Sequence, residues 1–485
     1  MYSPSLEDFI KRAREENLIP VHREIPADLE TPISIFGKID TGQHAFLLES
    51  AEKGKSLGRY SLLGSEPSLI FKVKGKRVQT IKGDSQESCE VPNPLQTLKK
   101  LMTDYRVVKE ENQPGFTGGA VGYLGYDIVR SFERLPDENP DDLGLPDALF
   151  FFADTFVLFD HLKHRVKVIA CARVQSDPEV AYNEAIERIE VLVKQLRGPS
   201  KILSALEDRR RKVEIRSNLT KEEFEGMVQM VKEYIEAREV RQVIISQRLE
   251  AEIDVSPFNI YRALRAINPS PYMFYLKYGD LKLIGASPEN LVKVRGRTVI
   301  TRPVASTMPR GKDFQEDDQL ALELFNSPKE KSEHTMLSRL CMEELEGICE
   351  KDSIKMDSEM EIERYSHVMH LVSTISGRLR EDKDSFGLLY ACFPSATITG
   401  VPKRRAMEII EEIEPVKRGP YTGSVGTLSF SGDLDLGIMV RTIIVKGNRA
   451  YIPVGCGIVA ASVPGKEYQE TMHKAQAQIR AIEVA

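Results

Sequence analysis

The sequence predicts an α+β protein in which large antiparallel β-sheets are layered with helices. Predicted strands and predicted helices occupy separate stretches of the chain, an order typical of α+β folds and not of doubly wound parallel sheets. Short turns join several strand pairs and favour antiparallel hairpins; examples are Gly75-Lys76, Ser431-Gly432-Asp433 and Lys446-Gly447-Asn448. With 485 residues, the chain is long enough for two domains with a sizeable core.

The first half of the chain is predicted to be β-rich. Its expected elements are strands at 45–49, 69–74, 77–81, 148–159 and 165–172 and helices at 93–105 and 180–195. Residues 197–217 are polar, charged and aperiodic, so we expect a linker there. The sequence therefore predicts two domains, 1–200 and 215–485.

The second half opens on a capping box, in which Thr220 and Glu223 satisfy free amides in the first turn of a helix that ends near Ala237. The other elements expected are a strand at 242–249, hairpins across 281–300, and helices at 257–267, 328–348, 366–373, 403–413 and 466–482. Two strand pairs precede the last helix, which completes an α+β order.

The composition excludes several functions. The 67 basic and 73 acidic side chains give a formal net charge of −6, and like charges do not form long runs, so we expect neither nucleic acid nor a membrane as a partner. The N-terminus lacks a signal-peptide pattern and Asp154 interrupts the longest apolar stretch, which favours a cytoplasmic location. The six cysteines show no C-x-x-C spacing, so we expect reduced and mostly buried thiols.

Two motifs lack the spacing that their cofactors require. The glycine-rich segment 118–125 matches neither the P-loop nor the dinucleotide fingerprint, so we interpret it as tight turns between strands. His367 and His370 lie three apart on a predicted helix without the H-E-x-x-H zinc pattern, which favours buried, hydrogen-bonded histidines over metal ligands.

Carboxylates in two predicted helices are more informative. Glu330 and Glu333 share one helix face, and helix capping by Ser327 explains only Glu330. In the last helix, Glu470 and its neighbours Glu467 and Lys474 line one face, for which a solvated, salt-bridged surface is the default. If the two helices meet, their carboxylates suit Mg²⁺ completed by water and an anionic substrate, and close carboxylates raise one another's pKa.

Eight strings, in this order, resemble anthranilate synthase component I of the chorismate-utilising enzymes. They are Leu47-Leu-Glu-Ser50, Asn268-Pro-Ser-Pro-Tyr-Met-Phe274, Gly285-Ala-Ser-Pro-Glu289, Thr301-Arg-Pro-Val-Ala-Ser-Thr307, Lys331-Ser-Glu-His334, Ile362-Glu-Arg-Tyr-Ser-His-Val-Met-His370, Gly419-Pro-Tyr-Thr-Gly423 and Glu467-Tyr-Gln-Glu-Thr471. The resemblance covers nearly the whole chain. It implies a two-domain fold and the Mg²⁺-dependent conversion of chorismate and ammonia to anthranilate and pyruvate, the first step of tryptophan biosynthesis. A separate glutamine amidotransferase subunit, component II, would supply the ammonia.

The resemblance also assigns roles to individual residues. Glu333 and Glu470 would bind Mg²⁺ and Glu467 would lie beside it; Glu330 would protonate the departing hydroxyl, and His370 would assist loss of pyruvate. Substrate contacts are implied for Ser306, Thr307, Thr397, Tyr421, Arg441, Gly455, Cys456, Gly457 and Lys474. Cation and amide donors of this kind suit a dianionic substrate.

Two positions bear on the nucleophile and product. Water-adding relatives place a lysine where this chain has Gln242, and a glutamine side chain cannot deprotonate water, so ammonia is favoured. Aminodeoxychorismate synthases often carry a lysine at the position of Ala305, but some have alanine, so component I of that enzyme stays an alternative. The absence of tryptophan from the chain is a weak hint toward tryptophan biosynthesis.

A feedback site for L-tryptophan is a further implication of the resemblance. Its residues would be Glu49, Ser50, Asn268, Pro271, Tyr272 and Met273, for which strand and turn packing is the alternative interpretation. The sequence departs from the family pattern at Arg238-Glu239, Ser306, Arg339–Glu344, Ala396 and Ala461. These departures keep a third hypothesis open, a catalytically weak paralogue that binds tryptophan or chorismate.

Overall fold

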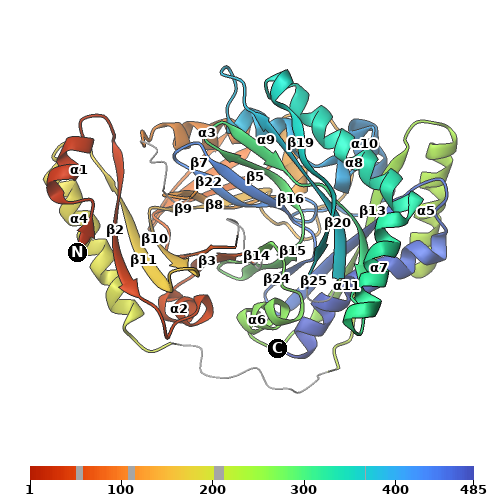
Figure 1. Ribbon diagram of the computed structural model, residues 1–485, viewed down its shortest axis with the longest axis horizontal. Coiled ribbons are helices and arrows are strands. Elements are labelled where there is room, and N and C mark those ends of the chain that lie inside the picture. Colours follow the sequence, from red (N-terminus) through yellow and green to blue (C-terminus); the bar gives the residue numbers. More distant parts are fainter. Residues whose placement is uncertain (51–57, 108–114, 201–211, 366–367) are drawn as a thin grey trace.

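The computed structural model describes residues 1–50, 58–107, 115–200, 212–365 and 368–485, with the backbone alone at 305–307 (Figure 1). The fold is α+β, as the sequence predicts, and consists of two large antiparallel sheets accompanied by helices. The helices are α1 (Leu6–Arg12), α2 (Pro32–Ile39), α3 (Pro94–Thr103), α4 (Pro178–Leu196), α5 (Lys221–Glu236), α6 (Pro257–Ile267), α7 (Phe314–Asn326), α8 (Pro328–Glu346), α9 (Ser385–Cys392), α10 (Lys403–Ile413) and α11 (Pro464–Glu483), with short 3₁₀ turns η1 (Tyr126–Ser131), η2 (Lys351–Ser353) and η3 (Ala396–Ile398).

The first sheet takes its strands from both halves of the chain. In spatial order it contains β1 (Tyr2–Ser3), β2 (Leu18–Pro26), β11 (Arg165–Arg173), β10 (Thr155–Asp160), β4 (Tyr60–Ser65), β3 (His44–Glu49), β14 (Tyr272–Tyr278), β15 (Leu281–Ser287), β24 (Thr442–Lys446), β25 (Arg449–Ile458), β13 (Gln242–Glu252) and β12 (Arg216–Ser217), with β21 (Gly400–Val401) beside β13. The two halves meet where β3 pairs with β14, with Glu49 opposite Met273.

The second sheet is divided in the same way. Its order is β18 (Val304–Pro309), β20 (Val368–Arg378), β17 (Thr298–Thr301), β16 (Asn290–Arg295), β23 (Leu434–Ile438), β22 (Ser424–Ser429), β8 (Gly119–Leu124), β9 (Ala148–Ala153), β5 (Leu69–Lys74), β6 (Arg77–Lys82) and β7 (Ser85–Glu90), with β19 (Lys355–Arg364) beside β20. Here the halves meet where β22 pairs with β8. Whether 1–200 and 215–485 act as separate domains stays a prediction.

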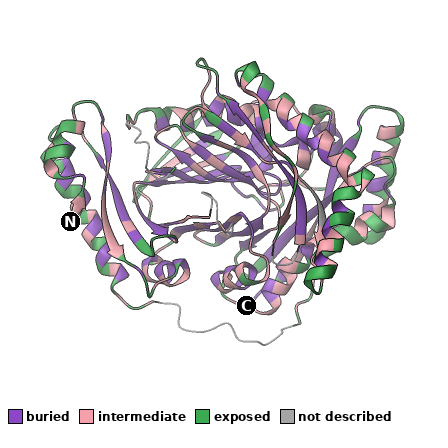
Figure 2. Ribbon diagram, viewed as in Figure 1, coloured by how far each residue is buried: buried purple, intermediate pink, exposed green. Residues whose placement is uncertain are grey.

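Buried apolar side chains concentrate on the strands, and exposed residues on the helices and loops (Figure 2). The largest cluster joins both sheets to α3, α8 and α9 and contains large aromatic side chains such as Phe46, Phe71 and Phe150. A second cluster packs α2, α4, α6 and α11 against the first sheet, and a third packs α5 and α10 over β13 and β25. Helices α8 and α11, which carry the candidate carboxylates, are therefore fixed on the sheets by their apolar faces.

Most predicted elements are confirmed. Helices α6 and α10 have the expected bounds, and in the capping box of α5 Glu223 accepts from the Thr220 amide at 2.7 Å while Thr220 accepts from the Glu223 amide at 3.2 Å. All six cysteines are thiols, and only Cys89 is exposed. None of the helices in the described ranges has the length and apolarity needed to cross a bilayer.

Two local predictions are wrong. The helix expected at 366–373 is strand β20 from Val368 on, while residues 366–367 lie outside the described ranges. Pairing with β17, β18 and β19 outweighs the helical spacing of the histidines. The glycine-rich segment is also mostly strand β8, where a Cβ at Gly122 would lie 1.9 Å from the carbonyl oxygen of Leu149 on β9. Glycine is needed there for close approach of strands, not for a turn.

Candidate active site

Helices α8 and α11 bring carboxylates from distant parts of the chain together. Ser327 caps α8 and accepts from the Glu330 amide at 3.4 Å, which places Glu330 and Glu333 at the start of the helix. Burial raises the pKa of Glu333, and the charges of Glu330 and Glu470 raise it further. The charge of Glu470 on α11 therefore acts on Glu333 of α8, as the predicted magnesium site requires.

Two cations lie beside these carboxylates. Lys474 Nζ is 2.7 Å from Glu470 Oε1 and donates to the Gly455 carbonyl at 3.2 Å. Arg441 donates from Nη1 to the Lys474 carbonyl and has a φ of +52°, a left-handed conformation that is uncommon for a residue with a side chain. Such backbone strain persists only where the surroundings hold it. Arg441 and Lys474 are suitably charged for the carboxylates of an anionic ligand.

The segment 455–457 of β25 is a further part of the candidate site. A Cβ at Gly455 would lie 2.9 Å from Tyr421 Oη, and a Cβ at Gly457 would lie 2.7 Å from Gln242 Nε2. Between them, the buried Cys456 thiol donates a hydrogen bond to Glu467, and its pKa is raised chiefly by burial. The two glycines therefore let the side chains of Tyr421 and Gln242 approach the strand directly.

The remaining predicted residues lie on elements packed against α8. That helix contacts β18, β20 and η3. His370 is buried in β20 opposite Thr307 of β18, and its ring centroid is 5.7 Å from that of Tyr365. Thr397 lies in η3, where its hydroxyl is 2.9 Å from Ser395 Oγ. Ala305, Ser306 and Thr307 are placed by their backbones alone.

Glu289 is a site residue that the sequence analysis missed. It follows β15, and burial raises its carboxyl pKa to about 7, although the charges of Lys474 and Arg441 oppose the shift. A carboxyl group of this kind is partly protonated near neutral pH and can donate a proton. The string Gly285–Glu289 carries the resemblance, but nothing in its spacing reveals that Glu289 lies within the influence of Lys474 and Arg441.

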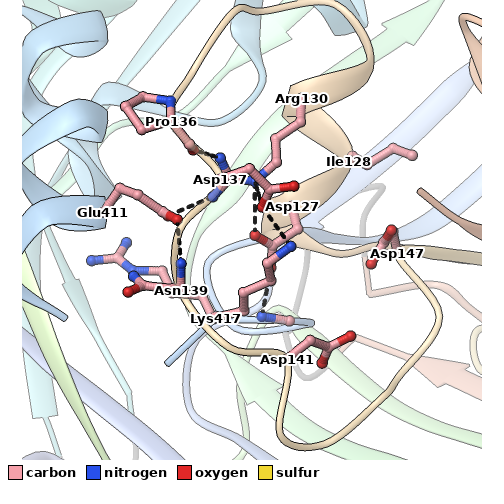
Figure 3. A network of polar contacts seen from close by, with 12 residues as sticks. Asp127, Ile128, Arg130, Pro136, Asp137, Asn139, Asp141, Asp147, Glu411 and Lys417 are labelled. Carbon is pink, nitrogen blue, oxygen red and sulfur yellow. Dashed lines mark hydrogen bonds and ion pairs between the residues drawn. The ribbon is translucent and has the colours of Figure 1, made fainter. Parts of the chain in front are cut away.

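The segment before Tyr421 is held by a network of polar contacts (Figure 3). Glu411 of α10 accepts hydrogen bonds from the amides of Glu138 and Asn139 at 2.8 and 2.9 Å and from Arg130 at 2.5 Å. Lys417 forms an ion pair with Asp137, and the Gly419 amide donates to Asp127 at 3.0 Å. The network ties the chain that leads to Tyr421 to the loop after η1.

The residues expected to bind tryptophan lie where the two halves of the first sheet meet. Asn268 ends α6, Pro271 precedes β14, and Ser50 directly follows β3. Met273 points into the core, whereas the Tyr272 hydroxyl donates to Asp435 of the second sheet at 2.8 Å. These residues converge at the junction of β3 with β14.

Glu49 in that group already has protein partners. Its Oε2 accepts from the Tyr261 hydroxyl at 2.6 Å and from Arg265 Nε at 2.9 Å, and its Oε1 accepts from Arg265 Nη2 at 3.1 Å. Ser61 donates to Oε1 at 3.4 Å. Both oxygens are thus engaged, which indicates a structural role for this carboxylate in shaping the junction.

The carboxylate site has the donors that Mg²⁺ requires but not a preformed cage. Within the described ranges, no group of three or more His, Cys, Asp or Glu side chains is arranged to hold a metal ion. Mg²⁺ typically takes one or two protein carboxylates and fills its octahedron with water and substrate oxygens. Glu333 and Glu470, whose mutual repulsion contributes to the raised pKa of Glu333, fit that donor set.

Comparisons with known proteins show the family of the chain. Residues 43–480 match the family described as chorismate binding enzyme. The chain therefore belongs to the chorismate-binding enzymes.

Within that family, the chain is similar over its full length to component 1 of anthranilate synthase. The protein from Acetivibrio thermocellus is 44% identical over 100% of this chain and 99% of its own length, and that from Aquifex aeolicus is 41% identical over 99% and 98%. The crystal structure of anthranilate synthase component I from Streptococcus pneumoniae superposes with a TM-score of 0.79 at 33% identity, covering 94% of this chain and 98% of that one. The isochorismate synthase MenF from Escherichia coli, at 17% identity and a TM-score of 0.74, shares the fold.

Proposed function

We propose that this protein is the large subunit of an anthranilate synthase, which converts chorismate and ammonia to anthranilate, pyruvate and water in the cytoplasm. The observation that carries the proposal is the grouping of charges beside the Gly455 strand, where Lys474 pairs with Glu470 and both charges act on Glu333. Full-length similarity to proteins named anthranilate synthase component 1 supports it.

In the proposed site, Arg441 and Lys474 bind the substrate carboxylates, and the amides of 455–457 and the Tyr421 hydroxyl supply neutral donors. Ser306, Thr307 and Thr397 would contribute further contacts. Glu333 and Glu470 would hold Mg²⁺, and Glu467 would lie near them. When bound, the metal ion offsets the negative charge of the ring carboxylate.

The chemistry then needs one proton donor and one nucleophile. Ammonia adds to the ring as the ring hydroxyl leaves as water, and Glu330 is one candidate for supplying the proton to that hydroxyl. Glu289 is the second candidate for this role, because its raised pKa keeps part of the carboxyl group neutral near pH 7. In the later step, pyruvate leaves and the ring loses a proton, a transfer that His370 assists.

Gln242 supports ammonia as the nucleophile. Its side chain is buried, and among the described residues none hydrogen-bonds its Oε1. A buried acceptor without a partner is unfavourable, and an incoming N–H donor would satisfy it. An amide oxygen is too weakly basic to deprotonate water, so the same residue disfavours addition of water.

The test uses purified protein with chorismate, Mg²⁺ and excess ammonium at alkaline pH, followed by anthranilate fluorescence and product identification. Anthranilate that is suppressed by tryptophan is the expected result. Accumulation of 4-amino-4-deoxychorismate would instead identify an aminodeoxychorismate synthase, and the lack of turnover despite tryptophan-dependent thermal stabilisation would identify a weak paralogue.

Two variants test whether Glu333 and Glu470 are the magnesium ligands. Glu333→Gln and Glu470→Gln are expected to abolish Mg²⁺-dependent turnover, because each removes one of the few protein ligands. Both variants should keep the wild-type melting temperature, since both side chains are partly solvated. A near-normal rate in either variant contradicts the assignment, and Glu483→Gln in the same helix α11 serves as the control.

The proposal also includes a source of ammonia and an inhibitor. A separate glutamine amidotransferase subunit, component II, supplies the ammonia, which is supported by the full-length relatives' being named component 1 of their enzyme. L-tryptophan inhibits by binding near Ser50 and 271–273, where strands from the two halves pair. Ligand binding at such a junction can bias how the halves pack.

A further inference from the structure

A single buried guanidinium group connects several segments around the candidate site. The Arg418 side chain is 2% exposed and its partner Glu414 is 3% exposed. Nε and Nη2 of Arg418 donate to the Glu414 carboxylate at 2.9 and 2.7 Å, and Nη2 also donates to the Ile244 carbonyl at 2.7 Å. Nη1 donates to the Ile398 carbonyl at 3.0 Å and to Thr422 Oγ1 at 3.2 Å. Every N–H group of this side chain thus has an acceptor.

Two of these acceptors adjoin candidate substrate residues. Ile398 directly follows Thr397 in η3. Ile244 of β13 pairs with Gly457 of β25, so its position sets that of the amides in 455–457. Arg418 therefore fixes the turn on one side of the site relative to the strand on another.

The third acceptor lies in a strained backbone. Thr422 has a φ of +59°, which is a genuine outlier for a β-branched residue. Its hydroxyl donates to the Tyr421 carbonyl at 2.6 Å and accepts from Arg418. Strain of this kind persists only where surrounding contacts over-determine the conformation, and it orients Tyr421 toward Gly455.

Glu414 extends the hydrogen-bond network of Arg418 to Ser246 and neutralises the charge of Arg418. Its Oε1 also accepts from the amide and the hydroxyl of Ser246 at 2.8 and 2.9 Å, and Ser246 pairs with Gly455. Because Glu414 neutralises Arg418 at close range, the guanidinium group is not available to attract an anionic ligand. Its hydrogen bonds to the Ile244 and Ile398 carbonyls hold the backbone of β13 and η3 instead.

We propose that Arg418 is a positioning residue of the chorismate site, which holds Thr397, Tyr421 and the amides of 455–457 in register without touching the substrate. The inference rests on the proposed function. A lysine at this position keeps the charge but has three N–H donors on one atom, so it cannot reach the acceptors that the planar guanidinium group spans.

The first experiment compares Arg418→Lys with a matched control. Misplacement of site groups by about 1 Å can cost about 10²-fold in rate, so kcat/KM for chorismate is expected to fall by about that factor. The control is Arg188→Lys, since Arg188 likewise binds a carboxylate, Asp154 at 3.1 Å, and a carbonyl, Cys171 at 2.7 Å, away from the site. Both variants should lose thermal stability, but Arg188→Lys should keep kcat/KM.

The second experiment separates positioning from folding. Millimolar guanidinium added to Arg418→Ala is expected to restore part of kcat/KM, and to do nothing for Arg188→Ala. If Arg418 variants do not fold, Thr422→Ala and Thr422→Ser replace them, and the serine variant should retain more activity because it keeps the hydroxyl that accepts from Arg418.

The outcomes are distinct from those of the proposed function. A wild-type protein that forms no anthranilate overturns the proposed function itself. An active wild type together with a folded Arg418→Lys variant of unchanged kcat/KM overturns the positioning role, as do equal activities of Thr422→Ala and Thr422→Ser.

Discussion

The protonation state of Glu289 gives the site a measurable pH dependence. Its pKa is raised to about 7, so the carboxyl group is mostly protonated below that pH and mostly ionised above it. If Glu289 is the proton donor, kcat/KM at a fixed concentration of free ammonia should fall about tenfold per pH unit well above pH 7. Glu289→Gln should lower kcat/KM and abolish this descending limb.

Glu330→Gln is the matched variant for that profile. Glu289 is influenced by the charges of Lys474 and Arg441, whereas Glu330 lies beside Glu333 on α8, and only one of the two carboxyl groups can supply the proton. A large loss of rate with Glu330→Gln, and a descending limb that survives in Glu289→Gln, would return the role to Glu330. The profiles are measured by anthranilate fluorescence at saturating Mg²⁺.

Two residues of the proposed tryptophan-binding site are expected to behave differently when mutated, because their contacts differ. Ser50→Ala is expected to raise the tryptophan concentration for half-inhibition about tenfold, the effect of losing one good hydrogen bond, with an unchanged melting temperature. Glu49→Gln leaves Arg265 without its charged partner, so the free energy of unfolding should fall by about 1–2 kcal/mol, a modest value because Arg265 is partly exposed. Inhibition curves and urea unfolding measure the two effects, and the reverse pattern would exchange the two roles.

Strand β25 of the candidate site depends on the absence of side chains at its glycines. A Cβ at Gly455 would lie 2.5 Å from the Ile245 carbonyl oxygen and 2.9 Å from Tyr421 Oη. Gly455→Ala must therefore displace β13 or Tyr421, and we expect kcat/KM for chorismate to fall by about 10²-fold. Gly465→Ala, where the nearest atom is the flexible end of Glu225 at 3.3 Å, is the control. Steady-state kinetics on both variants measure this effect. Equal kcat/KM values for Gly455→Ala and Gly465→Ala would contradict the prediction.

The segment that departs from the family pattern contacts an element of the candidate site through Glu344. Glu344 accepts from Lys403 Nζ at 3.0 Å and from the Ala396 amide, and Lys403 also donates to the Ala391 carbonyl at 3.1 Å. The carboxylate thus holds the start of η3, next to Thr397. Because Glu344 forms this buried ion pair and hydrogen bond, its presence argues against the hypothesis that the changes at Arg339–Glu344 make the protein a catalytically weak paralogue.

Elements were predictable where local signals determine them. The N-cap of α5 and the amphipathic pattern of α6 specify their helices from nearby residues, and the sequence analysis placed both correctly. Strand β20 was not predictable in this way, because its pairing with strands on both sides decides its structure. The same holds for the site: motifs named Glu333 and Glu470, but the roles of Glu289 and Arg418 depend on contacts across the fold.

At the scale of the whole molecule, each of the two sheets contains one junction between the halves of the chain. Residues before 200 supply one side of each sheet and residues after 215 supply the other, and they meet at the β3–β14 and β22–β8 pairs. Each half alone would therefore expose two unpaired strand edges and the apolar side chains that cover them. Exposed edges of this kind favour aggregation.

This arrangement predicts that the halves fold together. Expressed alone, fragments 1–200 and 215–485 should be insoluble or lack a cooperative thermal transition, because neither can pair β3 or β22 with its partner strand. Expressed in one cell with an affinity tag on the first fragment only, they should co-purify as an equimolar complex that makes anthranilate. The intact chain should unfold in a single calorimetric transition, because no sheet belongs to one half alone. Independent folding of either fragment with a melting temperature near that of the intact chain would show two autonomous domains.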